Sequence, residues 1–338
     1  MTSAAGAVLD DARDRVEPAM RMAVARLDPA NRLVAEYHLG YADAAGTPVA
    51  ESGGKGVRGA LALLSARAAG APAETGIPAA VACELVHNFS LLHDDIMDAD
   101  TTRRHRATAW TVFGTSAAIL GGDAMLGLAT EVLAEAASPT VPWAVRCLSA
   151  ATRRLIAGQA EDLAFESDQS VTLERCRQMA AGKTGALLAC AASLGSVLAD
   201  APASLTLSLA DFGQHVGMAF QLVDDLLGIW GSPERTGKPV ASDLASRKKS
   251  LPVVAVLAAG GDEADRLTEI YGRPGSLTDE ELAAAAEAVE RGGGRAWATA
   301  EADRETAAAL EILTDLPIDE DVRSDLRSVT EMLCGRDH

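Results

Sequence analysis

The stretch Glu84-Leu-Val-His-Asn-Phe-Ser-Leu-Leu-His-Asp-Asp-Ile-Met-Asp98 decides how this sequence folds. It contains no glycine or proline, and its apolar residues recur at intervals of three and four, which predicts an α-helix. At about 100° per residue, Asp94 and Asp98 each lie within about 20° of His87 around that helix. One stripe of a largely apolar helix therefore carries an imidazole and two carboxylates, with Asp95 beside them.

Helical spacing continues outward from this stretch, as in Leu61, Leu64 and Ala68. Alternating strand-like runs bounded by Asn-Gly or Asp-Gly turns do not occur. The 338 residues are 48% hydrophobic and 23% charged, which excludes disorder as the main state. No low-complexity linker divides the chain, so we expect one all-α domain over residues 1–338.

Glycine and proline clusters predict the ends of the helices. Thr278 and Glu281 have the spacing of a capping box, so a helix is expected to begin there and to end at the following glycine triplet. The predicted breaks are Gly53-Gly54, Gly70 to Pro72, Gly121-Gly122, Ser138-Pro139, Gly231 to Pro239, Gly272 to Gly275, Gly292 to Gly294, and Pro317.

Composition excludes several classes of protein. The acidic start is unlike a signal peptide, and no run approaches the roughly 18 apolar residues of a membrane-spanning helix. Five scattered cysteines indicate neither disulfides nor a zinc site, which favours the cytoplasm. A net charge of −18 without a basic stripe argues against a nucleic-acid partner.

The acidic stripe points to a metal ion. Carboxylates one helical turn apart repel each other, so a compensating cation is expected, and Mg²⁺ is the hard ion that carboxylates and phosphates hold together. A solvated acidic face is the alternative for one such motif. A second motif, Phe220-Gln-Leu-Val-Asp-Asp225, repeats paired aspartates in another apolar helical run. Two such sites in one chain favour a shared metal cluster.

Basic residues near glycines could bind a diphosphate, since glycine lets the backbone approach phosphate and arginine matches its oxygens. They are Lys55 and Arg58, Arg103 and Arg104, Lys183, and Lys238. The Gly-Lys-Thr run at Gly182 lacks the earlier glycine and strand of a P-loop, so a P-loop NTPase is not expected.

Taken in order, these motifs resemble those of the trans-isoprenyl diphosphate synthases, also called the polyprenyl synthetase family. The resemblance extends from about Gly53 to Pro252 and rests on Gly54-Lys55-x-x-Arg58, His87, Asp94-Asp95-x-x-Asp98, Arg103-Arg104, Gly158-Gln159-x-x-Asp162, Lys183-Thr184, Phe220-Gln221-x-x-Asp224-Asp225, Gly237-Lys238, and Asp243-Leu244-x-x-x-Lys248. It implies an all-α bundle around a central cavity, a homodimer, and Mg²⁺-dependent condensation of an allylic diphosphate with isopentenyl diphosphate.

The resemblance also implies roles for individual residues. Metal ligands would be Asp94, Asp95, Asp98, Asp224 and Asp225. Substrate diphosphates would bind Lys55, Arg58, His87, Arg103 and Arg104. Catalytic contacts would come from Lys183, Thr184, Gln221 and Lys238.

The sequence departs from the family pattern at three places. Gly228 stands where most members have a third aspartate in the second acidic motif. Gly56 replaces an arginine, and His105 and Ala107 replace a glycine and a proline. The first departure could weaken the site for one metal ion.

Product length in this family depends on side chains about one turn before the first acidic motif. Here Phe89 is bulky and Ser90 is small, and no residue is inserted in the motif. This combination resembles enzymes that make geranylgeranyl diphosphate, with farnesyl diphosphate as the alternative.

The sequence argues against three other functions. A class I terpene cyclase would need no second diphosphate site, so Lys55, Arg58, His87 and Arg104 argue against it. A non-catalytic synthase subunit would not be expected to keep both acidic motifs. A ferritin-like di-iron site would need a second Glu-x-x-His pair besides Glu84 and His87, and the other histidines lack one.

Overall fold

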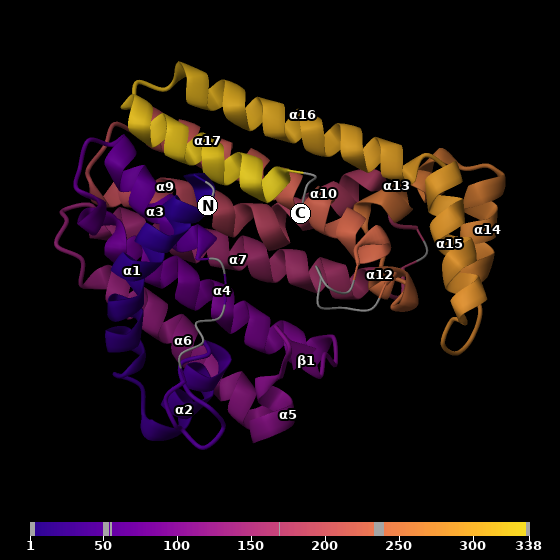
Figure 1. Cartoon of the computed structure of the whole chain (residues 1–338), viewed down its shortest axis with the longest axis horizontal. Helices are drawn as coiled ribbons and strands as arrows, with labels where there is room; N and C mark the ends of the chain where they lie inside the picture. Colours follow the sequence, from indigo (N-terminus) through magenta and orange to yellow (C-terminus); the bar gives the residue numbers. More distant parts are fainter. Residues whose placement is uncertain (1–3, 50–53, 55, 169, 233–239, 336–338) are drawn as a thin grey trace. The chain divides into compact units, whose positions relative to one another are not determined.

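The computed structural model describes residues 4–49, 54, 56–168, 170–232 and 240–335. Apart from two strands of two residues each, its regular structure is helical (Figure 1), which confirms the predicted all-α class. The first half of the chain contains α1 (Ala4–Val24), α2 (Pro29–His38), α3 (Val57–Ala68), the 3₁₀-helix η1 (Ala73–Gly76), α4 (Ile77–Met97), β1 (Thr102–Arg103), β2 (Arg106–Ala107), α5 (Ala109–Phe113), α6 (Thr115–Ala134) and α7 (Val141–Phe165).

The second half continues the helical pattern. It contains α8 (Leu173–Ala180), the π-helix η2 (Ala181–Gly185), α9 (Ala186–Leu198), α10 (Ala203–Trp230), α12 (Ser242–Ala245), α13 (Leu251–Ala259), α14 (Asp262–Tyr271), α15 (Asp279–Arg291), α16 (Gly294–Asp315) and α17 (Glu320–Cys334).

The chain divides into two compact units. Unit 1 comprises residues 1–152, 187–211 and 313–329, and unit 2 comprises residues 153–186, 212–312 and 330–338. The first acidic motif therefore belongs to unit 1 and the second to unit 2. A single domain over residues 1–338 stays a prediction.

In unit 1, α4 packs along α6, and the predicted break at Gly121-Gly122 is wrong because α6 passes through both glycines. A Cβ atom at Gly121 would lie 2.7 Å from Cγ1 of Val34, and one at Gly122 would lie 2.7 Å from Cδ2 of His93. These glycines allow neighbouring side chains to approach the helix, which explains why glycine occurs there without ending it.

Other predicted helix ends are confirmed. Thr278 and Glu281 form the expected capping box of α15, and the helix ends before Gly292. Loops also occur at Ser138-Pro139 and at Pro317. The predicted breaks at Gly53-Gly54 and Gly231 to Pro239 fall partly outside the described residues.

Among the described residues, two helical stretches are long and apolar enough to cross a membrane by length and composition alone. Thr115–Ala134 is 39% buried and Leu173–Leu198 is 78% buried over the most apolar window. Core helices of globular proteins pass the same test, and the burial of Leu173–Leu198 is that of a core helix. Helix α6 is much less buried, and it exposes apolar side chains such as Ile119 and Leu120.

Candidate functional site

The first acidic motif lies at the C-terminal end of α4, where Asp98 forms the cap. Its middle aspartate is buried: Asp95 is 1% exposed, and Nε of Arg103 donates to its Oδ1 at 2.6 Å. Burial raises the pKa of Asp95 despite the opposing charge of Arg103. Asp94 is only partly buried and Asp98 is exposed. Asp94 and Asp98 are thus the accessible carboxylates of the motif, whereas Asp95 is buried and paired with Arg103.

A tight hairpin carries the arginine pair. Strands β1 and β2 pair Thr102 with Ala107 and Arg103 with Arg106. The two turn residues, Arg104 and His105, have φ angles of 51° and 61°, in the left-handed region of a two-residue hairpin turn. Positive φ angles are unfavourable for residues other than glycine. Such a strained backbone conformation persists only where the surrounding structure holds it in place. The hairpin turn therefore holds the backbone of Arg104 in one conformation.

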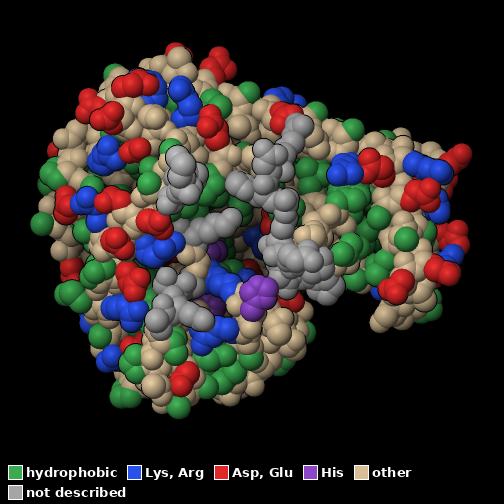
Figure 2. Space-filling model, viewed as in Figure 1, with side chains coloured by type: hydrophobic (Ala, Val, Ile, Leu, Met, Phe, Trp, Pro, Cys, Tyr) green, Lys and Arg blue, Asp and Glu red, His purple; other side chains and the backbone are tan. Residues whose placement is uncertain are grey.

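Arginine and histidine side chains lie near this hairpin in unit 1, where Arg58, Arg103 and Arg104 all act on His87. On the face drawn in Figure 2, basic side chains (blue) lie beside histidine side chains (purple). Arg58 lies in the first turn of α3, and Oε1 of Glu84 accepts a hydrogen bond at 3.0 Å from the next residue, Gly59. Burial, together with the charges of Arg58 and Arg104, lowers the pKa of His87 well below its usual value. His87 is thus neutral at pH 7, and the arginines supply the positive charge.

The second acidic motif lies on α10 in unit 2, and its two aspartates differ in the same way as Asp94 and Asp95. Asp224 is exposed, whereas Asp225 is 3% exposed. Asp225 accepts hydrogen bonds from Nε2 of Gln221 at 2.8 Å and from the backbone N–H of Leu251 at 2.9 Å. Burial raises the pKa of Asp225 to about 6. Asp225 therefore anchors the start of α13.

A third carboxylate occupies the place that Gly228 leaves open. A Cβ atom at Gly228 would lie 2.5 Å from Cγ of Asp243, so the Asp243 carboxylate fills the space of the missing side chain. Nζ of Lys248 lies 3.6 Å from Oδ2 of Asp243 and 3.9 Å from Oδ1 of Asp225. Burial lowers the pKa of Lys248, but the attraction of Asp243 and Asp225 outweighs it, and the net pKa is raised.

The π-helical turn η2 carries Lys183 and Thr184. Nζ of Lys183 contacts Oδ2 of Asp162 on α7 at 2.6 Å. Oγ1 of Thr184 donates to Oε1 of Gln221, and this bond joins η2 to the second acidic motif. Single π turns inside α-helices often occur at functional sites. Lys238 and Lys55, two other predicted substrate contacts, lie outside the described residues.

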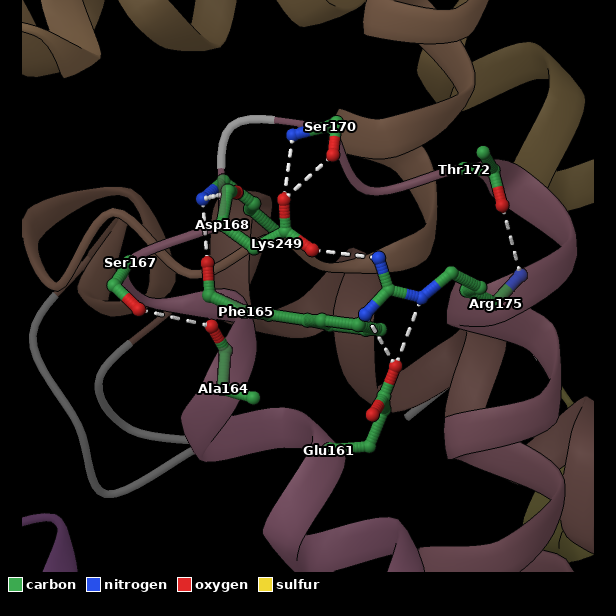
Figure 3. Close-up of polar contacts among 9 residues, drawn as sticks. All are labelled: Glu161, Ala164, Phe165, Ser167, Asp168, Ser170, Thr172, Arg175 and Lys249. Atoms are coloured by element: carbon green, nitrogen blue, oxygen red, sulfur yellow. Dashed lines mark hydrogen bonds and ion pairs between the residues drawn. The ribbon is translucent and has the colours of Figure 1, made fainter.

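The end of α7 is fixed by a polar network (Figure 3). Arg175 bonds Glu161 and Asp168 at 2.6 Å each, and its guanidinium lies 5.2 Å from the centre of the Phe165 ring. Nζ of Lys249 donates to the carbonyl oxygens of Phe165 and Asp168. Because Lys249 is held in this way, the backbone of its neighbour Lys248 is fixed beside the second acidic motif.

The donor set suits a hard divalent ion. Within the described ranges, no group of three or more His, Cys, Asp or Glu side chains forms a metal cage. Mg²⁺ does not need one, because it commonly takes one or two carboxylates together with water and substrate phosphate. The partly or fully exposed carboxylates Asp94, Asp98 and Asp224 match this requirement, whereas Asp95 and Asp225 are buried.

Comparison with known proteins decides the family. A family model described as polyprenyl synthetase matches residues 42–289. This chain belongs to the polyprenyl synthetase family. It is 50% identical over 332 residues to a (2E,6E)-farnesyl diphosphate synthase of Mycobacterium tuberculosis, with 97% of this chain and 92% of that protein covered. It is 40% identical to a geranylgeranyl diphosphate synthase of the same organism, with 98% and 94% covered.

A solved structure agrees with this assignment. A polyprenyl synthetase from Streptomyces coelicolor A3(2) superimposes with a TM-score of 0.92 at 49% identity, covering 97% of this chain and 98% of that one. The protein is thus a trans-prenyltransferase with the all-α fold of its family.

The predicted site residues divide between the two units, and some residues near them received no predicted role. Each unit brings its own predicted residues together: Arg58, His87, Arg103, Arg104 and the first acidic motif in unit 1, and Lys183, Thr184, Gln221 and the second acidic motif in unit 2. Sequence reasoning did not assign roles to Glu84, Asp162, Asp243 and Lys248. The last three occur inside the quoted polyprenyl synthetase motifs, which is a usable signal.

His38 was also missed. It lies at the end of α2 near the arginines of unit 1, and burial with repulsion from Arg104 and Arg103 lowers its pKa to about 3. No motif precedes it, so no sequence signal in a polyprenyl synthetase chain would have separated it from an ordinary core histidine.

Proposed function

We propose that this enzyme uses Mg²⁺ to condense an allylic diphosphate with isopentenyl diphosphate, and that its main product is geranylgeranyl diphosphate. One observation carries the proposal. In each acidic motif the first aspartate is accessible, and the next is buried and accepts a hydrogen bond from a neighbouring side chain, Arg103 or Gln221. Incubating the protein with Mg²⁺, dimethylallyl diphosphate and labelled isopentenyl diphosphate tests it.

Each acidic motif would hold Mg²⁺ through its accessible aspartates, Asp94 and Asp98 in unit 1 and Asp224 in unit 2. Asp95 fixes Arg103, and Asp225 fixes the start of α13. Bound Mg²⁺ offsets the charge that develops on the departing diphosphate. Lys183 donates to the same leaving group, and Asp162 keeps the Lys183 side chain extended.

Isopentenyl diphosphate binds the cationic group of unit 1. Arg58, Arg104 and Lys55 contact its phosphates, and neutral His87 donates one hydrogen bond. The double bond then attacks C1 of the allylic cation, a new carbon–carbon bond forms, and the departing diphosphate removes the proton. Holding both reactants in place lowers the entropic barrier of this step.

Replacing Arg58 by alanine is expected to raise KM for isopentenyl diphosphate by roughly tenfold or more, because one charge-assisted contact is lost. The KM for the allylic substrate should change less than about threefold. Steady-state kinetics with each substrate varied in turn gives both values. Arg67→Ala, at the far end of the same helix and paired with Asp325, is the control. Equal effects on both substrates would show that the two binding sites have been assigned wrongly.

Chain length is proposed to depend on α4. Phe89 is 5% exposed, and its ring meets the His93 ring edge-on with centroids 5.3 Å apart. Ser90 is also buried, and its hydroxyl donates to the carbonyl of His87 at 2.8 Å. By resemblance to the family, a single aromatic ring beside a small residue at these positions corresponds to a product of about twenty carbons.

Farnesyl diphosphate is the second candidate product. The 50% identity to a relative named as a farnesyl diphosphate synthase favours it, whereas the geranylgeranyl-producing relative from the same organism is 40% identical. The two candidates differ by one addition of isopentenyl diphosphate and are distinguished by product analysis.

Replacing Phe89 by alanine is expected to lengthen the products, and Ser90→Phe is expected to shorten them toward fifteen carbons. Chromatography of the dephosphorylated products measures both changes. Because removing a buried phenylalanine costs about 3–5 kcal/mol of stability, assays should be run well below the melting temperature. Phe113→Ala removes a ring packed on Tyr37 and serves as the control. An unchanged product distribution in an active Phe89→Ala enzyme contradicts the assignment.

We further propose a cytoplasmic homodimer formed through α6. This helix exposes Ile119 at 40% and Leu120 at 58%, and α5 adds exposed Val112. Such an apolar surface is typical of a protein interface. Sedimentation should give twice the 34.9 kDa mass of one chain, and Leu120→Glu should reduce it. A monomeric wild-type protein would oppose the proposal.

A further inference from the structure

Gln159 on α7 is a buried amide without a partner. Gln159 is 6% exposed, and among the described residues neither its Nε2 nor its Oε1 has a hydrogen-bond partner. More than nine in ten buried polar groups are paired, and leaving one unpaired costs about 1–3 kcal/mol. An amide with both ends unpaired is therefore retained against the stability of the fold.

The helix places this amide at a boundary. Leu148, Thr152, Leu155 and Gln159 follow one another at intervals of four, three and four, so they share one face of α7, and all four are buried. Asp162, one turn further on, pairs with Lys183. Gln159 thus lies between a buried apolar row and the Asp162–Lys183 ion pair.

The neighbouring turn is close to α7 at this point. A Cβ atom at Gly158 would lie 2.8 Å from Cα of Lys183, so Gly158 allows η2 to approach the helix directly beside Gln159. The backbone of α7 at Gly158 and Gln159 is therefore packed closely against that of Lys183.

We propose that the Gln159 amide stabilises the charge separation that ionises the allylic diphosphate; this rests on the proposed elongation reaction. In that step the C1–O bond breaks and its electron pair leaves with the diphosphate oxygen. Nε2 donates to this oxygen, whose negative charge grows. Oε1 faces the allylic carbons, where positive charge grows. The amide dipole thereby matches both charges.

The step balances without a further reactant. The cation is consumed when the double bond of isopentenyl diphosphate adds to C1, and the released diphosphate accepts the proton lost from the adduct. Because the two charges exist only during ionisation and addition, the amide contributes chiefly to the transition state and little to substrate binding. Its loss should therefore lower kcat more than it raises KM.

The test replaces Gln159 by leucine and, separately, by methionine. Both variants remove the unpaired polar atoms, so each is expected to raise the melting temperature by about 3 °C or more. The same variants should lower kcat roughly 10- to 100-fold, with KM for either substrate changed less than about threefold. A higher melting temperature combined with a lower kcat is not expected of a residue that merely supports the fold.

A second measurement isolates ionisation. Without isopentenyl diphosphate, the full-length enzyme should slowly hydrolyse geranyl diphosphate, and Gln159→Leu should slow this hydrolysis by the same factor as kcat. Thr152→Val is the control, because Thr152 lies on the same face but its hydroxyl is already bonded to the carbonyl of Leu148. It should leave kcat unchanged and should not raise the melting temperature.

The outcomes are distinguishable. A more stable Gln159→Leu enzyme with unchanged kcat overturns the inference, as does a variant that loses elongation but keeps hydrolysis. Melting temperatures below that of the wild type in both Gln159→Leu and Gln159→Met would also overturn it, because the amide would then stabilise the fold. Failure of the wild-type enzyme to elongate any allylic diphosphate contradicts the proposed function itself.

Discussion

Replacing Asp94 or Asp224 by alanine is expected to lower kcat by roughly 10³-fold or more, since each change removes a proposed metal ligand, worth several kcal/mol in the transition state. Both side chains are at least partly exposed, so neither change should lower the melting temperature much. Steady-state assays at saturating Mg²⁺ and both substrates measure the loss.

A control and a binding measurement complete this test. Glu311→Ala removes an exposed carboxylate from α16 and should leave kcat unchanged. Calorimetric titration of Mg²⁺ with inorganic diphosphate should show weaker binding to both aspartate variants. Near-normal turnover in both variants would remove the basis of the metal assignment.

Replacing Gly228 by aspartate completes the aspartate pattern of the second acidic motif, yet we expect it to reduce kcat roughly 100-fold. The new side chain would enter the space of the Asp243 carboxylate, because a Cβ atom there already lies 2.5 Å from Cγ of Asp243. It would also add a third carboxylate beside Lys248, next to those of Asp225 and Asp243. Activity and melting temperature should both fall.

A double variant at residues 228 and 243 tests whether these residues share one carboxylate position. If residues 228 and 243 share one carboxylate position, Gly228→Asp combined with Asp243→Ala should be more active than Gly228→Asp alone. Ala283→Asp, which adds a carboxylate to an exposed position of α15, controls for the change in net charge. Wild-type activity in Gly228→Asp, or a double variant no better than the single one, would contradict the shared position.

The helical class could be predicted from the sequence because apolar spacing records which face of each helix is buried. The ends of α15 were predictable for a similar reason, since the capping box of Thr278 and Glu281 is a local interaction. Gly121 and Gly122 were misread because glycine either ends a helix or admits a neighbouring side chain, and only the packing of Val34 and His93 decides which.

The acidic motifs show the same limit at the site. Adjacent aspartates are equivalent in the sequence, but adjacent residues on a helix point about 100° apart. Packing therefore buries Asp95 and Asp225 while Asp94 and Asp224 stay accessible. Likewise, the role of Asp243 at Gly228 depends on a contact across a loop, which no periodicity records.

Product analysis of the wild-type enzyme tests the central claim most directly. The full-length protein is incubated with Mg²⁺, dimethylallyl diphosphate and labelled isopentenyl diphosphate, with a parallel sample in EDTA, and the products are separated by chain length. We expect a Mg²⁺-dependent prenyl diphosphate, mainly of twenty carbons, and none in EDTA. A hydrocarbon or alcohol in its place, or no elongated diphosphate at all, would contradict the account.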